Sequence, residues 1–103
     1  MHIDWDRDHR PAWDIALHWR TLVTWDEHDR ARLAKVLEAT GKARHVAVVA
    51  DGERPACRLR LRLKAESGPE AMYLAVVVME TATEELGITL GDVVHVASTP
   101  ARS

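Results

Sequence analysis

The chain has 103 residues, of which 47% are hydrophobic and 29% charged, as is typical of one globular domain spanning residues 1–103. Its 14 Lys and Arg against 16 Asp and Glu give a net charge of −2, which excludes a uniformly basic nucleic-acid-coating protein. Cys57 is the only cysteine, so an internal disulfide is excluded and a reducing, cytoplasmic compartment is expected. The acidic opening "MHIDWDRD" is unlike a secretory signal, and no apolar run approaches the roughly 20 residues that span a membrane.

The first periodic segment is "WDIALHWRTLVTW", residues 13–25. Large apolar side chains occupy alternate positions, which favours one long or bent strand, or two successive strands. The predicted core-facing residues are Trp13, Ile15, Leu17 and Trp19. A helix stays open as an alternative, because Trp13, Leu17 and Arg20 also fit a 3.6-residue period.

A helix is predicted from Trp25 to Thr40. Thr24 and Glu27 have the spacing of a capping box, and Gly41 stands where a left-handed residue would end the helix. Leu33 and Leu37 lie on the face that would contact the core.

The rest of the chain is predicted to be mainly β-structure. "HVAVVA", "DG" and "CRLRLRLKA" predict a hairpin with a two-residue turn, and "AMYLAVVVM", residues 71–79, has the apolar character of a buried central strand. A short helical turn is expected over "TATEELG", from the capping-box spacing of Thr81 and Glu84 to a stop at Gly87. A last strand follows in "ITLGDVVHVA", and residues 98–103 are expected to form a frayed tail.

These elements define an α+β fold. We expect a small, partly open β-barrel of about five to seven strands, with one main helix and a short helical turn before the last strand. Exposed strand edges make a homodimer an expected assembly.

The end of the chain resembles a known superfold. "EELGITLGDVVHV" is similar to the glycine-aspartate ending of AbrB/MazE-like double-split β-barrels. Together with "LVTWDEHDRARLAKVLEATG" and "HVAVVADGERPACRLRLRL", it resembles a bacterial family of unknown function within that superfold. Some members of that family are attached to a YdeI-type, OmpD-associated domain. The resemblance spans roughly residues 20–97 and implies, by analogy with AbrB and MazE, a DNA-binding regulator.

The N-terminal "HIDWDRDHR" could bind a cation or form the charged edge of a strand. An EF-hand loop counted from Asp4 would need Gly and Glu where His9 and Ile15 stand, so that site is excluded. A transition-metal site formed by His2, Asp4 and His9 is chemically reasonable but lacks a second histidine pair. A strand edge, whose aspartates discourage edge-to-edge pairing, is favoured, and no cofactor is predicted.

The opposite charge gathers in "CRLRLRLK". In a strand, alternation would place three leucines on one face and four cations on the other. The cations are Arg58, Arg60, Arg62 and Lys64. Such a stripe could bind phosphate, nucleic acid or an acidic partner. The favoured interpretation of the stripe itself is a solvated face neutralised by Asp4, Asp6, Asp8 or Glu80, because the net charge is negative and no interleaved aromatic residues could stack on bases.

The remaining reactive residues give no catalytic motif. Cys57 would need a nearby histidine such as His45 or His95, and Ser67, Ser98 and Ser103 stand in no motif, so a buried, inert thiol and a non-enzymatic protein are expected. Core packing is the favoured role of the tryptophans, with a ligand pocket or dimer interface as the alternative. The tryptophans are Trp5, Trp13, Trp19 and Trp25, of which Trp5 is expected to be the most exposed.

The function favoured by these patterns is that of a small bacterial binding module, with a regulatory role as one expectation. It would engage an anionic ligand or protein partner through the four cations of residues 58–64. The alternatives are an AbrB/MazE-like DNA-binding regulator, which the negative net charge disfavours, and a small metalloprotein using the N-terminal His/Asp cluster.

Overall fold

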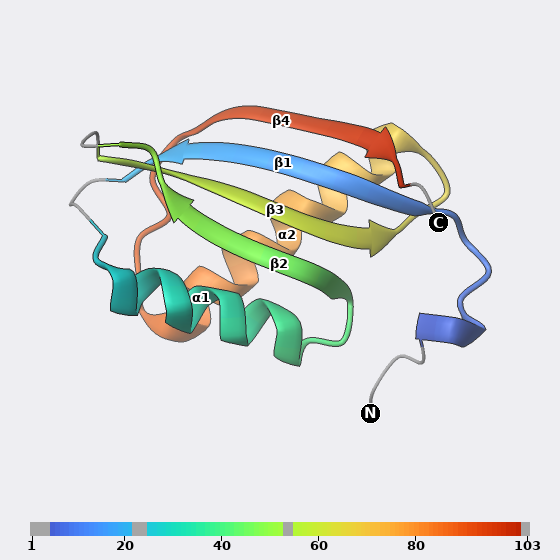
Figure 1. The fold of residues 1–103 in the computed structure, drawn as a ribbon, viewed down its shortest axis with the longest axis horizontal. Coiled ribbons are helices and arrows are strands. Elements are labelled where there is room, and N and C mark those ends of the chain that lie inside the picture. Colours follow the sequence, from blue (N-terminus) through green and yellow to red (C-terminus); the bar gives the residue numbers. More distant parts are fainter. Residues whose placement is uncertain (1–4, 22–24, 53–54, 102–103) are drawn as a thin grey trace.

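A computed structural model describes residues 5–21, 25–52 and 55–101. Figure 1 shows an antiparallel sheet with two helices packed against it. The elements are the 3-10 turn η1 (Trp5–Arg7), β1 (Ala12–Arg20), α1 (Glu27–Ala39), β2 (Ala43–Ala50), β3 (Ala56–Lys64), α2 (Gly68–Leu86) and β4 (Val93–Pro100). The fold is therefore α+β, as predicted.

The sheet has four strands in the order β2-β3-β1-β4, and each neighbouring pair is antiparallel. The sheet is not closed, which is consistent with the partly open barrel that was predicted, and over the described ranges it has four strands where about five to seven were expected. The element order with this strand order is the split βαβ, or ferredoxin-like, arrangement. This topology hosts many unrelated functions, so it does not by itself indicate one.

Strand β1 confirms the alternation predicted for the first segment. Ile15, Leu17 and Trp19 are buried, while Ala16 and Arg20 between and beyond them are exposed. Trp19 meets Trp25 in an edge-to-face contact with ring centroids 5.6 Å apart, a geometry that the aromatic quadrupoles favour. Both rings are therefore core residues, as expected. The part of the predicted strand at residues 22–24 lies outside the described residues.

Helix α1 forms where it was predicted but begins with a different cap. Asp26 is the N-cap and accepts a hydrogen bond from the Asp29 backbone N–H, while the Asp29 side chain accepts one from Asp26 N–H. Thr24, the predicted cap, lies outside the described residues. Gly41 follows the helix with φ 73°, the left-handed conformation expected there.

The prediction of a central strand over residues 71–79 is wrong, because this segment is the middle of α2. Ser67 caps the helix by accepting a hydrogen bond from Glu70 N–H, and a proline lies in the first turn. The small buried residues recur at helical spacing, so the helix can lie close to the sheet. They are Ala71, Ala75 and Ala82, with Met79 between them. The turn predicted over residues 81–87 is the end of this helix, and Gly87 is its C-cap with φ 69°.

The other departures are local. The β2–β3 connection spans residues 51–55 instead of two, and β4 continues to Pro100, so residues 98–100 pair with β1 instead of fraying. Residues 5–7 form a 3-10 turn and not the predicted strand edge. No helix within the described ranges is long and apolar enough to cross a membrane.

Gly91 shows how tightly the loop before β4 approaches β1. Its φ is 81°, and a Cβ built on it would stand 1.9 Å from the carbonyl oxygen of Arg20. The backbone N–H of Arg20 donates a hydrogen bond to the carbonyl oxygen of Asp92 at 2.8 Å. The positive φ favours glycine at this position, and the close approach of the Arg20 backbone is a second reason for glycine.

We expect Gly91→Ala to lower the free energy of unfolding by about 3 kcal/mol, because a left-handed alanine and a clash with backbone both cost energy. Gly87→Ala is the matched control: its φ is 69°, but apart from adjacent backbone no atom lies within 4 Å of the added Cβ. It should cost only about 1 kcal/mol. Urea denaturation measures both, and equal losses would contradict the close approach.

Candidate functional site

The candidate site is the face of the sheet that the helices leave uncovered, called here the open face. Strand β3 alternates as predicted: Leu59, Leu61 and Leu63 are buried toward the helices. The four cations between and after them emerge on the open face, with Arg58 and Arg60 exposed and Arg62 and Lys64 half-buried. The cationic stripe predicted from the sequence therefore exists as one surface.

This face has a strongly unequal charge composition. The four strands carry a single acidic residue, Asp14, in a chain whose net charge is −2. Their cationic residues are Arg20, Arg44, Arg58, Arg60, Arg62 and Lys64. The acids of the described chain are instead concentrated on the helices and loops, so the open face is positive while the molecule is not.

Strand register arranges the open face in rows. Ala97, Ala16, Arg60 and Ala47 form the central row, one residue from each strand. Thr99, Asp14, Arg62 and Arg44 form the row on one side of it. His95, His18, Arg58 and Val49 form the row on the other side. Arg60 thus stands among alanines, which are too short to cover it.

Two acids neutralise part of the stripe. Arg62 Nε donates to Asp14 Oδ1 at 2.8 Å, and its second nitrogen lies 3.3 Å from Oδ2, a two-point fork. Asp51, at the end of β2, lies 3.3 Å from Arg58 and 3.0 Å from His18 Nε2. Asp4, Asp6, Asp8 and Glu80 were the acids predicted for this role. In the described structure, the Asp8 carboxylate pairs with Arg10, and Glu80 lies on α2.

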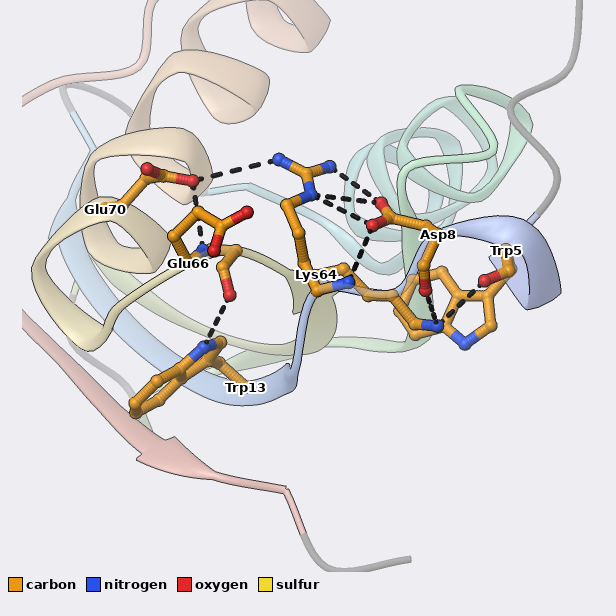
Figure 2. Close-up of polar contacts among 8 residues, drawn as sticks. Trp5, Asp8, Trp13, Lys64, Glu66 and Glu70 are labelled. Atoms are coloured by element: carbon orange, nitrogen blue, oxygen red, sulfur yellow. Dashed lines mark hydrogen bonds and ion pairs between the residues drawn. The ribbon is translucent and has the colours of Figure 1, made fainter.

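Lys64 is held by backbone and not by a carboxylate. Figure 2 shows its ammonium group between the carbonyl oxygens of Trp5 and Asp8, at 2.8 and 2.6 Å. The Trp5 ring lies under two cations, with Arg44 at 4.8 Å and Lys64 at 5.2 Å from its centroid. Trp5 is consequently half-buried and serves as an anchor for the N-terminal segment. Lys64 has little capacity left for a ligand.

Arg60 differs from its neighbours. Within the described residues it has no carboxylate or hydrogen-bond acceptor, and it lies beside two hollows of the open face. Arg58 is 62% exposed and has one long ion pair. Of the four predicted residues, Arg58 and Arg60 are therefore the ones free to meet a ligand. His18, His45 and His95 line the same hollows. Sequence reasoning did not consider His18 and considered His45 and His95 only as partners of Cys57.

Within the described residues, the structure does not bring Cys57 together with a histidine, and it describes only one of the three candidate metal ligands. Cys57 is buried toward the helices, and burial raises the pKa of its thiol. His45 and His95 are on the open face, so neither activates it. His2 and Asp4 lie outside the described residues and His9 is exposed, and the described part of the chain contains no group of three metal-ligating side chains.

No protein-family model matches the chain, and no curated protein matches it. The resemblance to AbrB/MazE-like barrels therefore stays a prediction. The evidence on function therefore comes from the geometry of the open face.

The pKa of Asp8 provides a test of the pairing between Asp8 and Arg10 in the N-terminal segment. The side-chain hydrogen bonds from Arg10 lower the pKa of Asp8 from 3.8 to about 2. Because the folded-state pKa is depressed, the stabilisation is present above pH 3.8 and is lost as the pH falls through about 2. Carboxyl-carbon NMR should give a midpoint near 2, and Arg10→Ala should move it upward. A wild-type midpoint at the ordinary value would contradict the pairing of Asp8 with Arg10.

Proposed function

We propose that this protein is a non-enzymatic binding module that engages an anionic partner through the open face. The observation that supports it most is Arg60: an exposed guanidinium without a described partner, at the centre of an uncovered, cationic sheet. A guanidinium group presents two parallel N–H donors that match the oxygens of phosphate or carboxylate. Arg58 lies two residues away on the same face and supplies the second available fork.

The paired cations have a supporting role in this proposal. Arg62 and Lys64 keep their charges on the open face but direct their donors to Asp14 and to backbone oxygens. They raise the local potential that attracts an anion, while Arg60 and Arg58 make the direct contacts.

A second copy of the chain is a poor occupant of this face. Stacking two open faces about a two-fold axis would bring the cationic stripe of one copy near that of the other, which like-charge repulsion opposes. A homodimer would instead pair the edge strands β2 or β4 and leave the open face available. A cytoplasmic location is part of this proposal, and the unpaired Cys57 supports it because cysteines usually stay free in a reducing compartment.

Duplex DNA is the alternative partner, supported by the row of cations along β3. The open face has no Phe, Tyr or Trp among its outward strand residues, so it offers no platform on which unpaired bases could stack. Binding to DNA would rest on phosphate contacts alone and would be strongly salt-dependent.

We predict that Arg60→Glu lowers the affinity for inorganic phosphate and sulfate by at least tenfold, because it replaces the free fork with a carboxylate. Arg32→Glu, the same change at an exposed position of α1, should lower it less than twofold. Isothermal titration calorimetry at low salt measures both. Equal losses in the two variants would contradict the proposed site.

A duplex DNA titration in the same buffers separates the alternative. A DNA affinity that falls steeply with salt and disappears in Arg60→Glu would replace the small-anion proposal with a DNA-binding one.

A further inference from the structure

The open face is hollowed on both sides of Arg60. The smaller hollow, about 270 Å³, is lined by Arg58, Arg60, His18 and His95 around Ala16. The larger hollow, about 430 Å³, is lined by Arg60, Asp14, His45 and Thr99 over Ala16 and Ala97. The two share Ala16 and Arg60, so one ligand could occupy both with Arg60 at its middle.

The smaller hollow has the chemistry of a phosphate site. Two guanidinium groups and two imidazoles surround it. Asp51 is not among the lining residues; it lies 3.3 Å from Arg58 and 3.0 Å from His18 Nε2, a nitrogen that makes no hydrogen bond within the described residues. His18 and His95 are directly opposite each other on neighbouring strands. A compact dianion placed here would meet donors from three strands.

The larger hollow has a different chemistry. Asp14 accepts hydrogen bonds and keeps free lone pairs beside its fork with Arg62, and the Thr99 hydroxyl can donate or accept. His45 enters from an irregularity of β2, where the register shifts between Arg44 and Ala47 and His45 has φ 55°. A non-glycine residue in this conformation is uncommon, and bulges of this kind redirect side chains. These groups suit hydroxyls, whereas the carboxylate of Asp14 repels a second phosphate.

We infer that the open face binds a phosphate monoester of a small polyhydroxylated molecule, such as a sugar phosphate. The phosphate would lie between Arg58 and Arg60, and the hydroxylated body would lie toward Asp14 and Thr99. The alanines of the central row leave space for that body. This inference rests on the proposed function and names its ligand class. A phosphodiester strand fits less well, because its next phosphate would approach Asp14.

The test is calorimetric titration of the whole chain with glucose 6-phosphate, inorganic phosphate and glucose. We expect glucose 6-phosphate to bind at least tenfold more tightly than inorganic phosphate, and glucose alone not to bind measurably. Arg60→Ala should weaken both phosphate ligands at least tenfold. Thr99→Val, which removes one hydroxyl at nearly constant shape, should weaken glucose 6-phosphate several-fold and leave inorganic phosphate unchanged.

Arg60→Lys guards against a folding artefact, because it keeps the charge and removes the fork. It should retain the fold and bind inorganic phosphate with intermediate affinity. If inorganic phosphate binds through Arg60 but glucose 6-phosphate binds no more tightly, the ligand class is wrong and the anion-binding function stands. If neither ligand binds, or Arg60→Ala binds both as wild type does, both proposals are overturned.

Discussion

Side chains along β3 alternate between the buried face and the open face of the sheet, and the rest of the structure depends on this alternation. Leu59, Leu61 and Leu63 are each 3% exposed or less, and burying such a side chain stabilises the fold by about 2 kcal/mol. The same alternation sends every intervening cation to the open face. A slip of one residue would bury the cations and expose the leucines, so the core fixes both the register and the recognition surface.

The position of β3 within the sheet determines which of its outward-facing cations have partners. Because β3 lies between β1 and β2, its outward residues are bordered on both sides, and the borders are unequal. Asp14 and Asp51 restrain Arg62 and Arg58, whereas Ala16 and Ala47 flank Arg60. The sheet therefore separates cations that hold the structure from a cation that is left available. The helices contribute by covering the other face completely enough that Cys57 and both core tryptophans are buried.

Much of this was readable from the sequence, and the failures have physical causes. Alternation predicted β1 and β3 correctly because one face of each is buried and the other is not. The error in α2 arose from the valines at residues 76–78, which favour strands locally, while the alanines of that segment recur at helical spacing. Tertiary packing against the sheet decided between them. Ser67 and the proline at position 69 were the available signal of a helix start.

The candidate site was predictable only in part. The stripe itself follows from residue order, but its partners depend on cross-strand register: Asp14 faces Arg62 because β1 and β3 pair as they do. No local pattern specifies that Arg60 lies opposite two alanines, or that an irregularity in β2 brings His45 to the same hollow. Of the acids predicted as partners, Glu80 lies on α2 and the Asp8 carboxylate pairs mainly with Arg10, because opposite charge alone does not bring two residues together in the fold. Asp4 and the side chain of Asp6 lie outside what the structure describes.

The most direct measurement of the central claim is NMR of the arginine Nε–Hε groups, assigned in the whole chain, during a titration with inorganic phosphate. The Arg60 and Arg58 signals should shift together and saturate with one dissociation constant, while those of Arg62 and of Arg32 on α1 change little. Saturable shifts centred on the helix arginines, with Arg60 unmoved, would contradict the account.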